Sequence, residues 1–322
     1  MTFLCKSHSV NLHRDYTGWW WSRKLNGFSM LWDGGISTRK PVGEIPWGKP
    51  RKRESLECMC TGLWTSDAHI IHAPKWWYKD FPQFVPLQGE CWYKDEKYYA
   101  SVCNSTYTKS SVDFRWKYLK FIIYNYKPYS LFKDFNLDWL SEGKKIFYPN
   151  KSFEERFKLI KQNIVNDRNT EVLNQFIIGS SASLKVILNE CTRGDSTNWE
   201  GLMISNPKGL YPLQYSYDIL KLKPEYDIEV KIIGYETSNS ISHKGKMQSL
   251  KVALTWNEKV LSFHGGQSRH IGREVTFFVG NGFNKWQREW DYVKEEWPLG
   301  KEIKILFNEV GENGAIPSSR IA

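Results

Sequence analysis

The sequence is poor in cysteine and has no long apolar run. Its six cysteines are Cys5, Cys58, Cys60, Cys91, Cys103 and Cys191. In a chain of 322 residues they are too sparse for the disulfide framework of a small secreted domain. Cys58 and Cys60 form a CxC pair, not the paired CxxC of a zinc site, so we predict a structural role for them.

Targeting signals are also missing from the sequence. No stretch reaches the roughly 18 apolar residues needed to cross a bilayer. No apolar segment follows the basic start of residues 1–12, so a secretory signal is not indicated. We therefore expect a protein of the reducing cytoplasm, bacterial or of a phage-infected host, without a membrane partner.

Acidic residues are the scarcer charged class. The chain has 35 Asp and Glu against 45 Lys and Arg, which gives a net charge of +10. Such an excess favours a polyanionic partner, because phosphates attract cationic side chains without any sequence code. Hydrophobic residues make up 41% of the chain, enough for a core in each of two domains.

The pattern of apolar residues predicts an α+β protein with two domains. Helical spacing is clearest over residues 153–163, and β-rich runs precede Pro224. After Pro224, short β-rich runs alternate with turns, which predicts a small β-barrel. We place the domains at residues 1–224 and 225–322. Residues 36–61, rich in Pro, Gly and charge, are interpreted as an exposed excursion.

The first chemical candidate is Lys24, in Lys24-Leu25-Asn26-Gly27. The surrounding residues predict a strand, a tight Asn-Gly turn and a second strand. A lysine amine that loses its proton can attack phosphorus and form a covalent intermediate. Taken alone, the pattern is explained better by a surface lysine at a hairpin.

Four further blocks follow in order. Leu87 to Trp92 places Glu90 after a glycine, and residues 120–125 end a predicted strand with Tyr124. Residues 200–204 place Glu200 before an apolar run. In residues 220–224, Lys221 and Lys223 are two apart, so on a strand both amines point to one face.

These five blocks resemble motifs I, III, IIIa, IV and V of covalent nucleotidyltransferases. Trp20 to Gly27, Leu31 to Gly34, Ala73 to Trp77 and Glu200 to Met203 are similar to small ATP-dependent DNA ligases of phages and bacteria. The similarity runs from about residue 18 to the end, and five short motifs in order are specific. It implies a nucleotidyltransferase (ATP-grasp-like ligase) domain followed by an OB-fold β-barrel.

The resemblance also implies an activity: sealing of nicked double-stranded DNA with ATP, as in replication, repair and recombination, by a monomeric enzyme. Lys24 would carry AMP, Tyr124 would stack on adenine, and Glu90 would bind the ribose or support the site. Glu200 would hold Mg²⁺ or Mn²⁺.

The two lysines of the last block, Lys221 and Lys223, would grip the phosphates. The resemblance implies a DNA grip for the OB domain, and we extend it to the basic run of the first domain. The candidates are Lys244, Lys246, Arg51, Lys52, Arg53 and Arg320.

The sequence departs from the family pattern at several motif positions. Asn26 replaces an aspartate, Asn125 an acid, and Ser29 and Ser66 stand where arginines are usual, while motif III carries Gln88. The missing arginines leave the binding of the 5′-phosphate unassigned. Arg23, Arg39 or the basic run 51–53 are the candidates to replace them.

Three alternatives remain open at this point. An RNA ligase or a GTP-using capping enzyme shares the lysine motif, and a non-catalytic DNA-binding homologue keeps the fold without the chemistry. Separately, His69 and His72 have the spacing of metal ligands on a helix. No third ligand stands out, so we interpret them as ordinary surface or core histidines.

Overall fold

The computed structural model of the chain divides into two compact units, Met1–Lys223 and Pro224–Ala322. It describes residues 4, 6–11, 14–52, 54–93, 114–180, 184, 186–188, 199–240, 244–257, 270–308, 310–311, 313–316 and 319–322. No helix in these ranges is long and apolar enough to cross a membrane. Both units are built mainly from β-sheets, and their helices are few and short. This is an α+β architecture.

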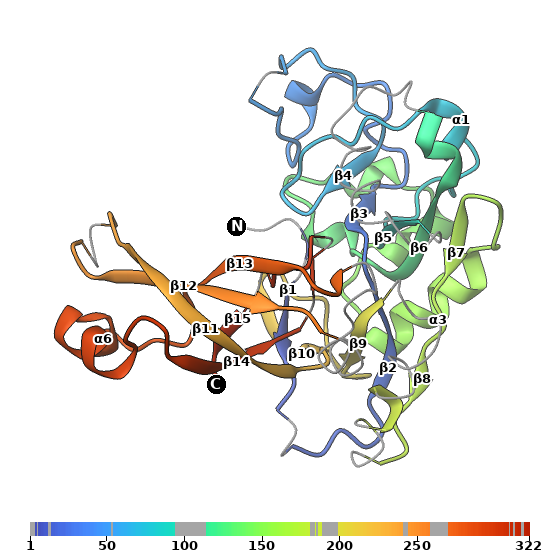
Figure 1. Cartoon of the computed structure of the whole chain (residues 1–322). Helices are drawn as coiled ribbons and strands as arrows, with labels where there is room; N and C mark the ends of the chain where they lie inside the picture. The colour runs from blue at the N-terminus through green and yellow to red at the C-terminus, as the bar shows by residue number, and fades with distance from the viewer. Residues whose placement is uncertain are drawn as a thin grey trace. The chain divides into compact units, whose positions relative to one another are not determined.

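The first unit contains two mixed five-stranded sheets (Figure 1). One has the order β1-β10-β9-β2-β8 and the other the order β4-β3-β5-β6-β7. The first sheet comprises β1 (Lys6–Ser9), β2 (Trp20–Leu25), β8 (Phe176–Ile177), β9 (Trp199–Ser205) and β10 (Tyr215–Leu222). The second comprises β3 (Phe28–Trp32), β4 (Leu63–Thr65), β5 (Leu87–Tyr93), β6 (Leu119–Tyr126) and β7 (Thr170–Val172). Each sheet has one parallel pair, β1 with β10 and β6 with β7.

One helix of this unit is long enough to have a distinct buried face. It is α3 (Phe153–Asn163), as the sequence spacing predicts. Ser152 caps its N-terminus and forms a capping box with Glu155, which satisfies backbone donors that have no partner inside the helix. Further helical segments include α1 (Lys75–Tyr78), η1 (Val42–Glu44), η2 (Phe114–Tyr118), η3 (Tyr129–Leu131), η4 (Leu137–Trp139) and η5 (Glu142–Phe147).

The Asn26-Gly27 turn differs from the hairpin predicted from sequence. A two-residue hairpin of type I′ needs positive φ at both turn residues, and neither residue has it. The strands on its two sides do not pair: β2 pairs with β8 and β9, and β3 with β4 and β5. The turn is therefore the crossover between the two sheets.

The exposed excursion predicted for residues 36–61 is also wrong. Ile36, Val42, Ile45 and Trp47 are buried in the main core of the first unit. The backbone closes this segment on itself, with N–H groups of residues 39, 42 and 43 donating to the carbonyls of residues 60, 58 and 56. The segment is therefore a folded insertion with many turns, and its apolar side chains pack into the core of the first unit.

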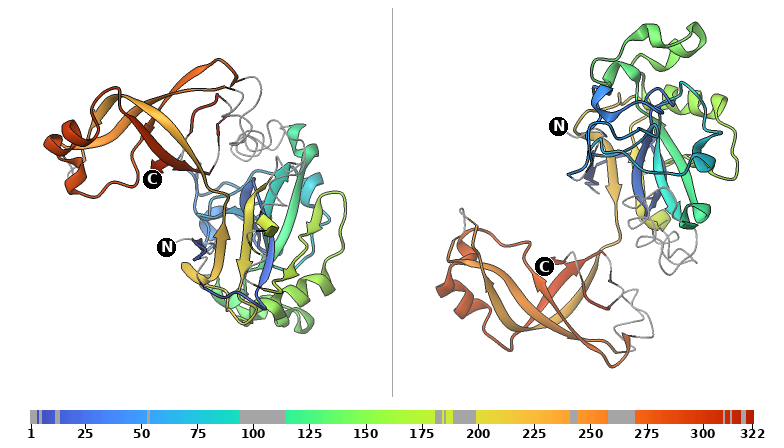
Figure 2. Two further views of the ribbon diagram at one scale, coloured as in Figure 1. Left: turned by 60° about the horizontal axis from the view of Figure 1, so that its bottom comes forward. Right: turned by 90° about the horizontal axis from the view of Figure 1, so that it is seen from above.

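The second unit is built on one antiparallel sheet of order β13-β12-β11-β14-β15 (Figure 2). The strands are β11 (Tyr226–Thr237), β12 (Met247–Thr255), β13 (Glu274–Val279), β14 (Glu302–Phe307) and β15 (Ser319–Ile321). Alternate residues of β11, Ile228, Val230 and Ile232, enter a separate core around Trp256. The described residues form a half-barrel sheet, and an isolated bridge joins Asn281, after edge strand β13, to Arg320 in the other edge strand.

Two helical segments precede β14. They are η7 (Trp286–Arg288) and α6 (Trp290–Glu296), neither of which the sequence analysis predicted. The indole Nε1 of Trp290 donates to the carbonyl of Gly245 over 2.7 Å, and the Tyr235 hydroxyl donates to Trp297 at the same distance. These bonds fix α6 beside the end of β11 and the start of β12.

Candidate active site

A cavity of about 400 Å³ lies between the two sheets of the first unit. Strands β1, β2, β3, β5, β6, β9 and β10 contribute to its walls together with α3 and neighbouring loops. The lining residues are Ser7, Ser22, Arg23, Lys24, Leu25, Ser29, Gln88, Glu90, Tyr124, Asn125, Phe153, Leu173, Gln175, Met203, Ser205, Tyr215, Ile219 and Lys221. Four residues singled out in the sequence, Lys24, Glu90, Tyr124 and Lys221, are therefore brought together.

Lys24 lies at the end of β2, opposite an irregularity in β9. Lys24 pairs with Gly201, whereas the next residue, Leu25, pairs with Trp199. Glu200 is thus the extra residue of a β-bulge beside the lysine; its side chain lies outside the described residues. Bulges of this kind redirect side chains and recur next to active sites.

Glu90 holds the turn that follows Lys24. One carboxylate oxygen accepts from the Gly27 N–H at 3.2 Å, and the other accepts from the Ser29 hydroxyl at 3.2 Å. Gly27 is required for this approach, since a Cβ at this position would lie 2.3 Å from the carbonyl oxygen of Cys91. Ser29, where the family pattern has an arginine, therefore anchors this carboxylate in the cavity wall.

Tyr124 owes its place in the cavity to a second bulge. Gln88 pairs with Asn125, but Gly89 pairs with Ile123, so Tyr124 is the extra residue of β6. In a regular strand neighbouring side chains point to opposite faces. Because of the bulge, both Tyr124 and Asn125 line the cavity.

Asn125 is fixed by an arginine that the sequence analysis missed. The Nε of Arg156 donates to Asn125 Oδ1 over 2.9 Å, and Nη1 donates to the carbonyls of Lys151 and Gly209. Arg156 is 1% exposed, and these three acceptors are neutral oxygens. The signal in the sequence was its place on the apolar face of α3, next to Phe157.

Lys221 and Lys223 differ in position. Lys221 lines the cavity, whereas Lys223 follows the end of the strand as the last residue of the unit. Strand periodicity places Ile219 and Lys221 on one face of β10, but it does not extend to Lys223, so the shared face predicted for the two lysines is not formed. Gly201 allows β10 to come close, because a Cβ there would lie 2.1 Å from the carbonyl oxygen of Leu222.

Arg23 is the one candidate arginine substitute that lines the cavity among the described residues. Arg39 is exposed and is not part of its lining, and Ser66 lies in the turn that follows β4. The cavity thus combines the basic groups of Arg23, Lys24 and Lys221 with the Glu90 carboxylate and an aromatic ring. This set suits a ligand with an aromatic base and phosphates.

The acid of the Leu31 to Gly34 block, Asp33, lies apart from the cavity. It is fully buried and accepts hydrogen bonds from Trp64 Nε1 at 2.8 Å and from the Ser37 hydroxyl. Burial raises the pKa of Asp33 to about 6, and these hydrogen bonds oppose the rise. Its role is to support the core.

The basic residues predicted to grip DNA fall into two groups. Arg51, Lys246 and Arg320 are paired with Glu54, Glu289 and Glu225. Lys52 and Lys244 are exposed, and Arg53 lies outside the described residues.

Comparison with known proteins supports a common origin with DNA ligases. No protein-family model matches the chain. The chain is 22% identical over 309 residues to a DNA ligase of Haemophilus influenzae, covering 95% of this chain and 86% of that protein. These findings confirm the resemblance to small ATP-dependent DNA ligases predicted from the motifs.

Solved structures show that the fold is shared with such enzymes. A structure from an analysis of Lig E DNA ligases, described as binding DNA with a minimal scaffold, has a TM-score of 0.68 and 19% identity. The superposition covers 99% of this chain and 97% of that one. A chain named Pmar-Lig matches with a TM-score of 0.66 and 15% identity, over all of this chain and 67% of the other.

Proposed function

We propose that the protein is an ATP-dependent DNA ligase that seals nicks between a 3′-hydroxyl and a 5′-phosphate in duplex DNA. The observation that carries the proposal is the convergence of Lys24, Glu90, Tyr124 and Lys221, from four different strands, on one cavity. Similarity to the Haemophilus influenzae DNA ligase along 95% of the chain supports the same activity.

The reaction proceeds in three transfers. The Nζ of Lys24 attacks the α-phosphorus of ATP; an N–P bond forms, and the bond to pyrophosphate breaks. The 5′-phosphate of the nick then attacks the same phosphorus and takes AMP from the lysine. Finally the 3′-hydroxyl attacks the activated 5′-phosphate, the phosphodiester forms, and AMP leaves.

The other cavity residues orient and neutralise the nucleotide. Tyr124 stacks on the adenine, and Glu90 accepts a ribose hydroxyl while it holds the turn after Lys24. Lys221 and Lys223 neutralise the phosphates, which stabilises the negative charge that develops on the pyrophosphate leaving group in the transition state. Arg23 is our candidate for the role of the missing family arginines, because it lines the cavity beside Lys24.

A divalent cation, Mg²⁺ or Mn²⁺, would add charge neutralisation at the phosphates. We propose Glu200 as its protein ligand, because the bulge places this residue between Trp199 and Gly201, the partners of Leu25 and Lys24.

We further propose that residues 1–224 form the adenylation domain and residues 225–322 an OB-fold that binds the duplex. The five-stranded sheet of the second unit and the bridge from Asn281 to Arg320 support a closed barrel. Such domains bind nucleic acid through basic and aromatic faces.

Labelled ATP tests the proposal directly. Incubation with ATP and Mg²⁺ should add one AMP to the chain, and nicked DNA should then remove it. Lys24→Ala should carry none. Sealing rates should then be compared on three nicked duplexes of one sequence: all DNA, DNA with an RNA strand at the 3′-hydroxyl, and all RNA. Faster sealing of the all-RNA nick would favour an RNA ligase. Absence of nucleotide transfer from both ATP and GTP would leave only a DNA-binding homologue.

A further inference from the structure

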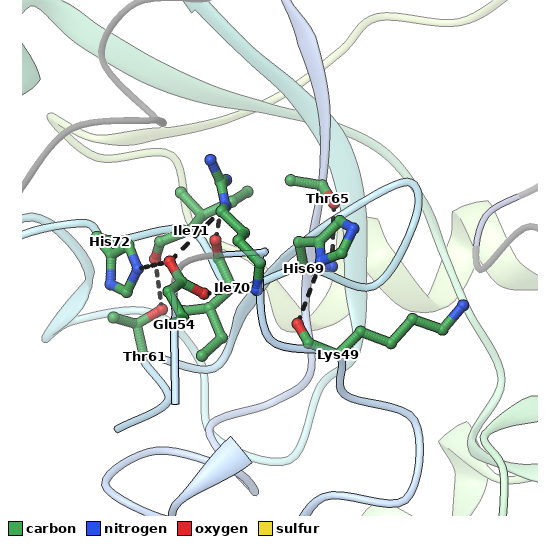
Figure 3. A network of polar contacts seen from close by, with 9 residues as sticks. Lys49, Glu54, Thr61, Thr65, His69, Ile70, Ile71 and His72 are labelled. Atoms are coloured by element: carbon green, nitrogen blue, oxygen red, sulfur yellow. Dashed lines mark hydrogen bonds and ion pairs between the residues drawn. The ribbon is translucent and has the colours of Figure 1, made fainter. Parts of the chain in front are cut away.

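Three side chains with metal-binding atoms meet between η1 and α1, away from the cavity. They are Glu54, Cys58 and His72, and their ligand atoms all lie within 4.8 Å of one another. The imidazole Nε2 of His72 is 2.7 Å from Oε1 of Glu54, and Figure 3 shows the two side chains facing each other. None of the three lines the cavity between the sheets.

Two consecutive turns position Glu54 and Cys58. The Glu54 N–H donates to the Arg51 carbonyl at 2.9 Å, and the Arg51 N–H returns a bond of 2.9 Å to the Glu54 carboxylate. The Cys58 N–H donates to Ser55 over 3.1 Å, and the Cys58 carbonyl accepts from Val42 at 2.9 Å. Both residues are thus held by their backbones as well as by side-chain contacts.

A separate set of bonds positions His72. The Thr61 hydroxyl donates to the Ile71 carbonyl at 2.7 Å, and the Ile71 N–H donates to Leu63 over 2.9 Å. His69 does not join the cluster: its Nδ1 lies 3.2 Å from the Lys49 carbonyl (Figure 3). The helical metal pair that the sequence analysis set aside is not formed, because residues 69–72 are not helical.

The chemistry of the three groups favours Zn²⁺. A thiolate, an imidazole and a carboxylate are the ligand types of zinc sites, whereas Mg²⁺ and Ca²⁺ prefer oxygen alone. Zinc bonds of about 2.0–2.3 Å place tetrahedral ligand atoms about 3.3–3.6 Å apart. The three ligand atoms, all within 4.8 Å of one another, lie close to this spacing. The thiolate and carboxylate balance the charge of the ion.

We propose that Glu54, Cys58 and His72 form a Zn²⁺ site, with water as the fourth ligand. Partial exposure of Glu54 and His72, 17% and 25%, leaves room for that water. The ion joins the loop of residues 51–58 to the segment that follows β4. It is a structural clip, independent of the nucleotide chemistry.

Cobalt substitution of the full-length protein tests the site. One equivalent of Co²⁺ should give a thiolate-to-metal charge-transfer band with the intense visible bands of a tetrahedral site, and Zn²⁺ should displace it. Cys58→Ser and Cys58→Ala should abolish the charge-transfer band. Glu54→Gln and His72→Asn should weaken Zn²⁺ binding at least tenfold, as measured with a competing chelating dye. Zn²⁺ should raise the melting temperature of the wild type but not that of the Cys58 variants.

Matched controls separate this cluster from its neighbours. His69→Asn and Cys60→Ser change residues of the same types close by, and both should keep the bands and the affinity. The proposal is overturned if wild type gives no thiolate band, if the band survives in both Cys58 variants, or if His69→Asn weakens binding as much as His72→Asn. Adenylation is not needed for any of these measurements, so they are independent of the ligase assignment.

Discussion

At the scale of single residues, Glu90 connects the lysine turn to the cavity wall. Its carboxylate bonds to Gly27 and Ser29, so we expect Glu90→Ala to displace Lys24 and lower the adenylation rate by about 100-fold, as small misplacements of reacting groups do. Single-turnover AMP transfer measures this rate. Ser29→Ala removes only one of the two bonds and should cost about tenfold or less. An equal effect of the two variants would contradict the anchoring role.

Asp33 gives a second residue-scale prediction, on stability. Its pKa of about 6 in the folded protein exceeds the ordinary aspartate pKa of 3.8, so the native state keeps a proton that the unfolded state loses between these pH values. The contribution of Asp33 to the free energy of unfolding is therefore greatest below about pH 4. It falls by roughly 3 kcal/mol as the pH rises to about 6. Urea unfolding of wild type and Asp33→Asn should show the wild type losing stability relative to the variant across this window.

A control for Asp33 comes from its hydrogen-bond partner. Ser37→Ala removes a bond that opposes the rise of the Asp33 pKa, so it should move the transition to higher pH. A stability difference between wild type and Asp33→Asn that stays constant with pH would contradict the raised pKa.

Single residues also show the limit of reading function from sequence. Lys24, Glu90 and Tyr124 were singled out because they stand in recognisable motifs, and the cavity brings them together. Arg156 has no motif, and its contact with Asn125 joins a helix and a strand 31 residues apart. The cluster of Glu54, Cys58 and His72 likewise could not be predicted from the sequence, because the fold, and not the spacing along the chain, brings Cys58 close to His72.

At the scale of elements, the bulge in β6 turns the Tyr124 ring into the cavity. Removal of the ring in Tyr124→Ala should raise the KM for ATP by about 5- to 150-fold, the equivalent of ~1–3 kcal/mol of base stacking. Tyr124→Phe keeps the ring and should stay close to wild type. Tyr118→Ala removes an exposed tyrosine outside the cavity lining, and its KM should not change. Equal KM values for the Tyr124 and Tyr118 alanine variants would rule out stacking.

The crossover at Gly27 predicts a steric effect. A methyl group there would lie 2.3 Å from the Cys91 carbonyl oxygen and 2.9 Å from Glu90 Cγ. Gly27→Ala should therefore cost about 1–3 kcal/mol of stability and most of the adenylation activity. Thermal unfolding and AMP transfer measure both. Gly143→Ala has open space around its Cβ and should change neither; a harmless Gly27→Ala would refute the close approach.

Local patterns predicted most elements but not their partners. Alternating and helical spacing identified α3 and most strands, because side-chain burial follows the period of the backbone. The partner of β2 is β9, about 180 residues later, and no local pattern encodes that pairing. The prediction of an Asn-Gly hairpin was wrong for this reason. The bulges at Glu200 and Tyr124 likewise depend on strand pairing between distant segments.

At the scale of the whole molecule, the +10 charge predicts salt-dependent binding to nicked DNA. The logarithm of the binding constant should fall linearly with the logarithm of the salt concentration, with a slope of about −0.9 for each phosphate contacted. Lys244→Ala should reduce the slope by about one, because this lysine is exposed. Lys304, paired with Asp227 at 2.9 Å, is the control, and Lys304→Ala should keep the wild-type slope. Binding that ignores salt would refute the phosphate grip.

The strand order of the first unit has a consequence for its synthesis. The sheet with Lys24 joins the start of the unit, β1 and β2, to its end, β9 and β10, whereas β3 to β7 form the sheet between them. On the ribosome, the inner sheet can assemble while β9 and β10 are still unmade, and β2 must wait for them. Closing so long a loop is slow. A nascent chain should therefore gain its nucleotide pocket only after residue 222 has emerged.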